Sequence, residues 1–286
     1  MRIVSLLPAG TEIVAALGLD DELVGVGHRS GAAAAPAEPP LVTRPAAGRD
    51  REDVLDLDAF VAADPDLVLV GQGDDGGIDA RALQEALGGR ADPSVLSLAP
   101  GSVEGVLNAI VAVGAMTEAE DEALAVVEDL RERLKVLEEV VIGRRDHGFR
   151  PPRVVVLDEV DPPRAAGRWV PDQVRLAGGW ELLGQAGEPA RGTTWEDVRE
   201  VDPEVLVLVP RGLPLRDAVE AWAATPRPEG WEELRAVRDG RVHVVDGGAF
   251  ATAGPRVIDG IEILAELLDP AAFDGMAPPD TWVRAR

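Results

Sequence analysis

Three acidic residues in the second half of the chain are the clearest candidates for acid–base or metal chemistry. Asp158, Glu159 and Asp161 end a short apolar run, and closely spaced carboxylates can exchange protons or hold a hard cation. On so acidic a protein they can equally be solvated loop charges, which is the interpretation we favour. No serine lies in a nucleophile-elbow pattern, so covalent hydrolysis has no candidate. We expect no catalytic residue and no metal site formed by the protein.

A glycine-rich loop raises a second chemistry, the binding of a dinucleotide. Residues 71–76 have the spacing G-x-G-x-x-G after an expected strand and before an expected helix, as pyrophosphate-binding turns do. Asp74 and Asp75 would repel a pyrophosphate, and the next strand ends in Leu98-Ala99-Pro100 without an acid for a ribose. We therefore reject a dinucleotide site. The loop is either a flexible binding loop or a plain glycine turn.

The histidines, the tryptophans and the lack of cysteine limit which metal sites and ligand contacts the chain can form. Cysteine is absent and there are three histidines, which excludes disulfides, thiolate sites and a histidine-rich metal centre. His28 ends an expected strand and is either a ligand contact or a loop residue, whereas His243 lies within a strand and is expected to be structural. Trp169 either stacks on a planar ligand or packs at a hinge.

The chain is strongly acidic, with a formal net charge of -24 and a single lysine, Lys135. This charge excludes nucleic acid as an expected partner. Adaptation to high salt would explain the composition, because molar salt screens such repulsion. A GC-rich genome that avoids lysine codons is the alternative. No apolar run is long enough to span a membrane or to form a secretory signal, so we expect a cytoplasmic protein, or an extracytoplasmic one if a signal has been removed. We also expect a monomer.

Strands and helices alternate in both halves of the chain, which predicts parallel, doubly wound sheets. In the first half we expect strands at 2–6, 23–27, 67–70 and 95–98, with helices at 11–17, capped by Thr11, and at 80–87. In the second half we expect strands at 153–157, 205–209 and 242–245, with helices at 170–176, 195–200, 215–223 and 257–268. The phrases AADPDLVLVGQG and REVDPEVLVLVPRG repeat one helix–strand pattern.

Between the halves, two helical segments run from 102 to 141. In the second, apolar residues recur every three or four positions and predict one buried stripe, formed by Leu124, Val127, Leu130, Leu134, Leu137 and Val141. The expected organisation is an N-terminal lobe at 1–116, a backbone helix and its exit at 117–145, and a C-terminal lobe at 146–286. A ligand cleft is expected between the strand ends of the two lobes.

Several phrases occurring in one order resemble a known family. RIVSLLPAGTEIVAALGL, DPDLVLV, DPP-x5-WVPDQVRLAGG, TTWEDVREVDPEVLVLVP and GPRVIDGIEIL are similar to segments of the helical-backbone (class III) solute-binding proteins for iron-siderophores, haem and cobalamin, above all the cobalamin-binding members. The resemblance implies an ABC-transport receptor without catalysis or a cofactor of its own. Its ligand would be a corrinoid, haem or ferric chelate. The alternative is a cytoplasmic enzyme, or a corrinoid or metal-chelate chaperone, that reuses the fold.

The resemblance also implies the binding residues. Ligand contacts map to Pro8, Ala9, Gly10, Thr11, His28, Arg29, Gly71, Gln72, Gly73, Asp74, Arg164, Trp169, Arg191, Phe250 and Arg256. Docking to an ABC permease maps to one acid in each lobe, Asp58 and Glu196. Arginines stand where cobalamin-binding relatives show aromatic residues, which favours an anionic ligand. Alternatively, these arginines pair with Asp158, Glu159 or Asp161 and only hold loops.

Overall fold

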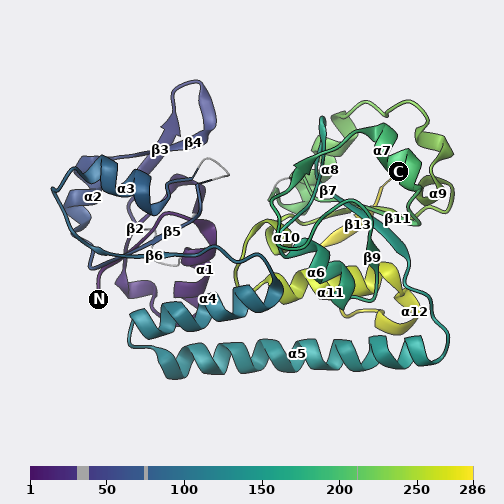
Figure 1. Ribbon diagram of the computed structural model, residues 1–286, viewed down its shortest axis with the longest axis horizontal. Helices are drawn as coiled ribbons and strands as arrows, with labels where there is room; N and C mark the ends of the chain where they lie inside the picture. The colour runs from purple at the N-terminus through teal and green to yellow at the C-terminus, as the bar shows by residue number, and fades with distance from the viewer. Residues whose placement is uncertain (31–38, 74–76, 211, 286) are drawn as a thin grey trace. The chain divides into compact units, whose positions relative to one another are not determined.

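The chain divides into two compact units in the computed structural model, which describes residues 1–30, 39–73, 77–210 and 212–285 (Figure 1). One unit comprises residues 1–99 and 105–129, and the other residues 100–104 and 130–286. Each contains a β-sheet with helices packed on it, so the expected α/β class with two lobes is confirmed. The lobe boundaries at 116 and 145 stay predictions.

The first unit is built on a four-stranded parallel sheet in the order β2-β1-β5-β6. The strands are β1 (Ile3–Ser5), β2 (Leu23–Val26), β5 (Leu67–Val70) and β6 (Ser94–Ser97), and the helices are α1 (Pro8–Ala16), α2 (Leu57–Ala63), α3 (Ala80–Leu87) and α4 (Val103–Met116), with 3₁₀ turns η1 (Asp20–Glu22) and η2 (His28–Ser30). The all-apolar β5 is buried along its whole length, as a strand in the middle of a parallel sheet should be.

The first helix begins earlier than the sequence predicts. Pro8 is its first residue, where the fixed φ of proline suits a helix and its missing N–H is not needed. Thr11 is therefore not the N-cap. It is buried inside the helix, and its Oγ1 donates to the Leu7 carbonyl oxygen at 3.4 Å.

A β-hairpin that the sequence analysis did not predict extends from the first unit (Figure 1). It consists of β3 (Thr43–Ala46) and β4 (Arg49–Leu55), joined at Ala47 and Gly48. Gly48 has φ of +73°, a conformation that glycine adopts without strain. The charged letters RDRED in β4 carry no apolar alternation, so periodicity could not reveal the strand.

The second unit contains a seven-stranded sheet in the order β10-β8-β7-β11-β12-β13, with β9 also paired to β7. Strands β7, β9, β11 and β12 pair in parallel, whereas β8 pairs antiparallel with both β7 and β10, and β13 pairs antiparallel with β12. The predicted strands are thus parallel, and the sheet also contains antiparallel strands that the sequence analysis did not predict. The strands are β7 (Arg153–Val160), β8 (Pro163–Ala165), β9 (Trp180–Glu181), β10 (Arg191–Gly192), β11 (Val205–Leu208), β12 (Val242–Val245) and β13 (Trp282–Arg284).

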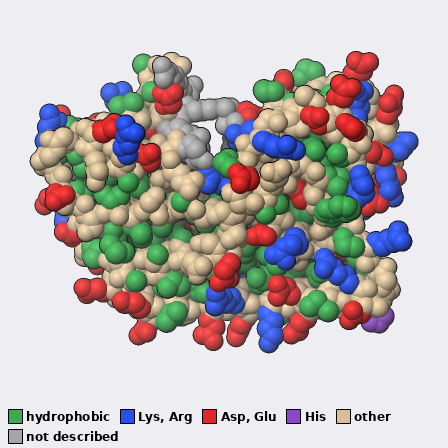
Figure 2. All heavy atoms as spheres, viewed as in Figure 1, with side chains coloured by type: hydrophobic (Ala, Val, Ile, Leu, Met, Phe, Trp, Pro, Cys, Tyr) green, Lys and Arg blue, Asp and Glu red, His purple; other side chains and the backbone are tan. Residues whose placement is uncertain are grey.

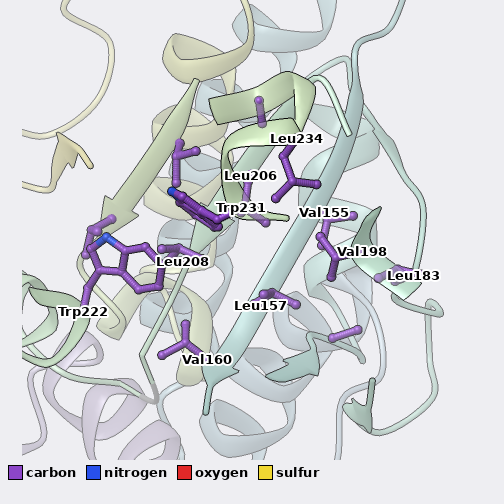
Figure 3. Packing of buried hydrophobic residues seen from close by; sticks show 14 of the residues in the cluster. Val155, Leu157, Val160, Leu183, Val198, Leu206, Leu208, Trp222, Trp231 and Leu234 are labelled. Atoms are coloured by element: carbon purple, nitrogen blue, oxygen red, sulfur yellow. The ribbon is translucent and has the colours of Figure 1, made fainter. Parts of the chain in front are cut away.

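The helices of the second unit cover a core that includes tryptophan (Figure 3). They are α6 (Val170–Leu176), α7 (Trp195–Val201), α8 (Leu215–Ala224), α9 (Arg235–Arg238), α10 (Gly248–Ala251), α11 (Val257–Leu268) and α12 (Pro270–Phe273), with the 3₁₀ turn η3 (Trp231–Glu233). Trp222 and Trp231 pack with Leu206 and Leu208 of β11, and their ring centroids lie 5.1 Å apart. Both tryptophans are core residues.

The repeated sequence phrase forms the same anchored helix–strand pair in both units. In the first, the Arg2 backbone N–H donates to Asp66 at 2.8 Å, and its guanidinium donates to the Ala63 carbonyl oxygen at the end of α2. In the second, the Arg153 backbone N–H donates to Glu204 at 2.9 Å, and its guanidinium donates to Val201 at the end of α7. Both helices end at a left-handed aspartate before a proline, at Asp64 and Asp202.

The long helix α5 (Glu120–Asp146) contributes residues to both units. Its predicted apolar stripe is buried at Val127, Leu130, Leu137 and Val141 and partly buried at Leu134, but Leu124 is 56% exposed and that part of the prediction is wrong. At about 100° per residue, Leu124 lies about 120° around the helix from Leu130. Ala123, four residues before Val127, takes the buried position instead.

Candidate ligand-binding site

The predicted binding segments of the first unit all follow carboxyl ends of adjacent parallel strands. Pro8 to Thr11 come after β1, His28 and Arg29 after β2, and Gly71 to Gly73 after β5. Because β2, β1 and β5 are neighbours and parallel, the three segments lie at one edge of the sheet, where doubly wound folds bind ligands. The structure thus brings these segments together. Asp74 lies outside the described residues.

At the start of α1 a ligand would meet backbone atoms more than side chains. Ala9, Gly10 and Thr11 are buried, and a Cβ added at Gly10 would lie 2.7 Å from Ser5 Oγ. A residue with a Cβ at position 10 would collide with Ser5, so glycine allows the helix to approach the sheet this closely. Pro8 remains partly exposed. In the loop after β5, Gln72 is exposed and Gly73 has φ of +77°.

His28 and Arg29 form a charged cluster with two residues of the hairpin. The His28 backbone N–H donates to Thr43 Oγ1 at 2.9 Å, and its Nδ1 lies 3.0 Å from the same oxygen. On the other side of the ring, Nε2 is 3.7 Å from Asp53 Oδ1, and Arg29 Nε is 3.0 Å from that oxygen. The Asp53 side chain is only 1% exposed. Thr43 and Asp53 were missed by the sequence analysis.

The order Asp53, His28, Thr43 has the outline of a catalytic triad, but its geometry does not support catalysis. A nucleophile must reach its substrate, and Thr43 is only 3% exposed. Its oxygen already accepts the backbone N–H of His28. The cluster therefore connects His28 and Arg29 to the hairpin.

In the second unit, Arg256 is placed at the carboxyl edge of the parallel strands by two aspartates. Asp246 directly follows β12, and its Oδ1 accepts from Arg256 Nη2 at 3.0 Å and from the Gly248 backbone N–H at 3.0 Å. Asp259, in the first turn of α11, lies 4.0 Å from Arg256 Nε. Asp259 also pairs with Arg133 of α5 at 2.6 Å. A chain of alternating charges thus connects α5 to the predicted binding residue.

The structure brings Trp169 and Phe250 together, but both are buried. Trp169 is 8% exposed, and its indole N–H donates to the Phe250 carbonyl oxygen at 3.1 Å. One turn later in α6, the fully buried Gln173 donates to the carbonyl oxygens of Ala249 and Val257, at 3.1 and 2.8 Å. In this conformation, Trp169 packs and positions the α10 segment rather than presenting an open ring face.

Arg164 is engaged by one of the acids that we first weighed for catalysis. Its guanidinium makes a bidentate pair with Asp158, at 2.8 and 2.7 Å, and lies 3.9 Å from Glu159. The hydrogen bonds from Arg164 to Asp158 raise the pKa of the guanidinium. This favours the interpretation of these acids as structural charges. Among the described residues, no group of three or more His, Cys, Asp or Glu could hold a metal ion.

Arg191 lies on β10, next to the strand that carries Arg164. Its Nε donates to the Leu183 carbonyl oxygen at 3.1 Å. It lines a small surface pocket of about 160 Å³ together with Thr193, Asp197 and Glu200. Two acids thus share this pocket with one arginine. Hydrogen bonds from Thr194 and Thr193 lower the pKa of the Asp197 carboxyl, which favours its charged form.

Asp58 and Glu196 occupy equivalent places in the repeated helix–strand pair. Each is the second residue of its helix, α2 or α7, and each is exposed. The first helix is capped by Asp56, which accepts from the Ala59 backbone N–H at 3.1 Å, and the second by Thr194, which accepts from that of Asp197 at 3.0 Å. An acid in the first turn is favoured by the helix dipole, so local stability alone would also explain both residues.

Comparisons with known proteins agree on one family and one fold. A family model described as periplasmic binding protein matches residues 3–248. The chain is 28% identical over 281 residues to the ABC transporter substrate-binding lipoprotein YvrC of Bacillus subtilis, covering 95% of this chain and 81% of the relative. Its fold is similar to that of a periplasmic haem-binding protein from Pseudomonas aeruginosa, with a TM-score of 0.75, 24% identity and coverage of 95% and 93%. It is also similar to the periplasmic vitamin B12 binding protein BtuF of Vibrio cholerae, with a TM-score of 0.69, 21% identity and coverage of 94% and 97%.

Proposed function

Since this chain belongs to the periplasmic binding protein family and is a solute-binding protein of the ABC-transport class, we propose that its solute is a metal chelate: a haem, a corrinoid or a ferric siderophore. Solved proteins of the same fold include haem-binding and vitamin B12-binding ones, which supports this range. The chelate brings its own metal, so the protein needs to supply only polar and apolar contacts.

The expectation of a cytoplasmic location is wrong. The matched family is that of periplasmic binding proteins, and the Bacillus subtilis relative is a lipoprotein. A cytoplasmic enzyme or chaperone therefore has no support as a second function. No helix in the described part of the chain combines the length and apolar character that a membrane crossing requires.

The observation that carries the proposal is the position of the predicted binding residues. In the first unit, three segments follow the ends of neighbouring parallel strands, and in the second, Asp246 and Arg256 follow β12. Loops at this edge bind ligands in doubly wound folds because several of them converge there. Two further predicted contacts, Trp169 and Phe250, are buried in the described conformation, and their part in binding stays a prediction, as does that of Arg164 and Arg191.

The ligand is identified by absorption and calorimetry. The protein is purified from its native host and its visible spectrum is recorded, because each proposed chelate absorbs there. Ligand-free protein is then titrated with haemin, cyanocobalamin and a carboxylate-type ferric siderophore. We expect saturable binding of one of them with 1:1 stoichiometry. A colourless native protein that binds none of the three would overturn the proposal.

The arginines near the strand ends favour a ligand with peripheral carboxylates. Arg164 uses Nε and Nη2 for Asp158, and a guanidinium has five N–H donors. A carboxylate can therefore be bound while the aspartate stays in place. Arg164→Ala combined with Arg191→Ala should weaken binding of the carboxylate-bearing probes on the order of tenfold or more. Strong cyanocobalamin binding unaffected by both substitutions would exclude this anionic preference.

The partner that would receive the ligand is an ABC permease, and we propose Asp58 and Glu196 as the docking acids. Their equivalent positions on α2 and α7 support this role, since one permease with repeated basic pockets could contact both. Asp58→Arg with Glu196→Arg should abolish transport while calorimetry shows unchanged ligand binding. Glu232→Arg, another exposed acid, is the control. Transport that persists in the double variant would contradict the docking role.

A further inference from the structure

The β3–β4 hairpin reaches the end of β2 through two side chains, Thr43 and Asp53. Both side chains are nearly inaccessible to solvent, since Thr43 is 3% exposed and the Asp53 side chain 1% exposed. The groups that they contact remain open, because the side chains of His28 and Arg29 are 16% and 29% exposed. A buried carboxylate thus supports a partly exposed imidazole and a partly exposed guanidinium.

The hydrogen bonds of Thr43 constrain the imidazole. Because Thr43 Oγ1 accepts the His28 backbone N–H at 2.9 Å, its own hydroxyl proton can be donated to His28 Nδ1, 3.0 Å away. Nδ1 is then the acceptor, and the ring proton of a neutral histidine resides on Nε2. That nitrogen is the one that lies 3.7 Å from Asp53 Oδ1, where a negative charge favours an N–H.

Asp53 also fixes the neighbouring cation. Arg29 Nε lies 3.0 Å from Asp53 Oδ1 and 3.2 Å from Oδ2. A buried carboxylate is stable only when its charge is compensated. Asp53 and Arg29 therefore stabilise each other. The cation compensates the charge of the aspartate, and the aspartate holds the cation at the strand end.

We infer that Asp53 is a positioning residue for ligand binding: with Thr43 it holds His28 in the Nε2–H tautomer and fixes Arg29. The inference rests on the proposed function, in which His28 and Arg29 contribute to the binding edge of the first unit. It assigns a role to the hairpin, which would otherwise be a surface ribbon. Asp53 itself does not touch the ligand, since its carboxylate is enclosed.

Positioning and simple charge predict opposite effects on affinity. Asp53→Asn removes one negative charge beside two basic side chains, so an electrostatic effect alone would tighten the binding of an anionic probe such as haemin. If the carboxylate positions the cluster, the same substitution weakens binding on the order of tenfold, because an orienting hydrogen bond to a charged group is lost. The matched control is Glu52→Gln, which removes the same charge from the adjacent exposed residue.

The test has a ligand-free arm and a binding arm. Nitrogen-15 NMR of the three histidines should show His28 as the Nε2–H tautomer in wild type and in Glu52→Gln, and a mixture of tautomers in Asp53→Asn and Thr43→Val. Calorimetry with haemin and cyanocobalamin should show weaker binding for Asp53→Asn and unchanged binding for Glu52→Gln. Circular dichroism verifies that each variant is folded.

The two arms separate the failure of this inference from that of the proposed function. An Nδ1–H tautomer in wild type, or equal or tighter binding by Asp53→Asn, would overturn the positioning role of Asp53. If the wild type binds neither probe nor a ferric siderophore, the proposed function fails, while the NMR arm still decides whether Asp53 and Thr43 orient His28.

Discussion

At the scale of single residues, the second unit contains two buried groups whose pKa values are displaced in opposite directions. His243 in β12 has no hydrogen-bond partner for either ring nitrogen among the described residues, and burial lowers its pKa to about 4. Glu181 in β9 accepts from the backbone N–H groups of Leu183 and Gly184, both at 3.0 Å. Burial nevertheless raises its pKa to about 7. Both groups favour the neutral form in the folded state.

The His243 shift makes the protein less stable in acid. Between about pH 6.5 and 4 the unfolded chain binds a proton that folded His243 does not, so the free energy of unfolding falls as pH decreases. The loss is up to about 3 kcal/mol, since a tenfold change in proton affinity is worth about 1.4 kcal/mol. Glu181 contributes the opposite slope over much of this range, so in denaturant unfolding measured from pH 4 to 7 His243→Gln should make stability fall with rising pH more steeply than in the wild type. An unchanged slope would show that His243 is protonated while folded.

The Glu181 shift has the opposite sign. From about pH 4.5 to 7 the folded state holds a proton that the unfolded chain has released, so the free energy of unfolding falls as pH rises. In Glu181→Gln this contribution disappears, and the remaining His243 effect should make stability increase with pH. In the wild type the two contributions oppose each other, and in the double variant both are absent. In both proteins the free energy of unfolding should therefore change little between pH 4.5 and 6.5. Identical pH profiles for the two single variants would contradict both assignments.

Sequence reasoning found the exposed residues of the candidate site more readily than their supports. His28, Arg29 and Arg256 were identified through the family resemblance, and His28 also because it follows an expected strand. Thr43, Asp53 and Gln173 were missed because their contacts cross 15, 24 and 76 or more residues. Thr43 and Asp53 also belong to a hairpin without a periodic signal. Such partners are fixed by tertiary structure, which local patterns do not encode.

At the scale of elements, the strand–helix alternation was predictable and the additions to it were not. Strands β1, β2, β5, β6, β7, β11 and β12 are apolar runs between turn residues, which is the signal of a buried parallel strand. Strands β8, β9, β10 and β13 have two or three residues each. They are too short for periodicity to show, and they form because an adjacent strand offers unpaired backbone groups.

The packing of α10 and the start of α11 against α6 can be tested with one substitution, at Gln173. Gln173 of α6 makes two hydrogen bonds to its surroundings, and Gly260 is required because a Cβ there would lie 2.3 Å from Gln173 Nε2. Gln173→Leu leaves the carbonyl oxygens of Ala249 and Val257 without these donors and should cost about 2 to 4 kcal/mol in chemical denaturation. Gln185→Leu, at an exposed position, should change stability by less than about 0.5 kcal/mol. Equal effects would show that the two bonds contribute nothing.

At the scale of the whole molecule, the net charge of -24 is the dominant feature. Figure 2 shows acidic side chains scattered over the face that it draws, with basic ones among them. Individual ion pairs such as that of Arg81 with Glu85 are exposed and contribute little. The summed repulsion therefore matters more than any single pair.

We expect the thermal midpoint to rise with salt. The Debye length falls from about 10 Å at 0.1 M to about 3 Å at 1 M, which screens the repulsion between surface carboxylates. Thermal unfolding followed by circular dichroism from 0.1 to 2 M potassium chloride measures the effect. Sucrose at matched osmolality controls for the general strengthening of apolar burial. A midpoint that is independent of salt would argue against salt adaptation.

The repeated anchoring of α2 by Arg2 and of α7 by Arg153 has an evolutionary consequence. The framework of each unit is secured at the amino ends of its strands, whereas the loops that would meet a ligand leave from the carboxyl ends. Substitutions accumulating in those loops leave the anchors intact. We therefore expect the loops of each unit to tolerate sequence change while both units retain the same scaffold.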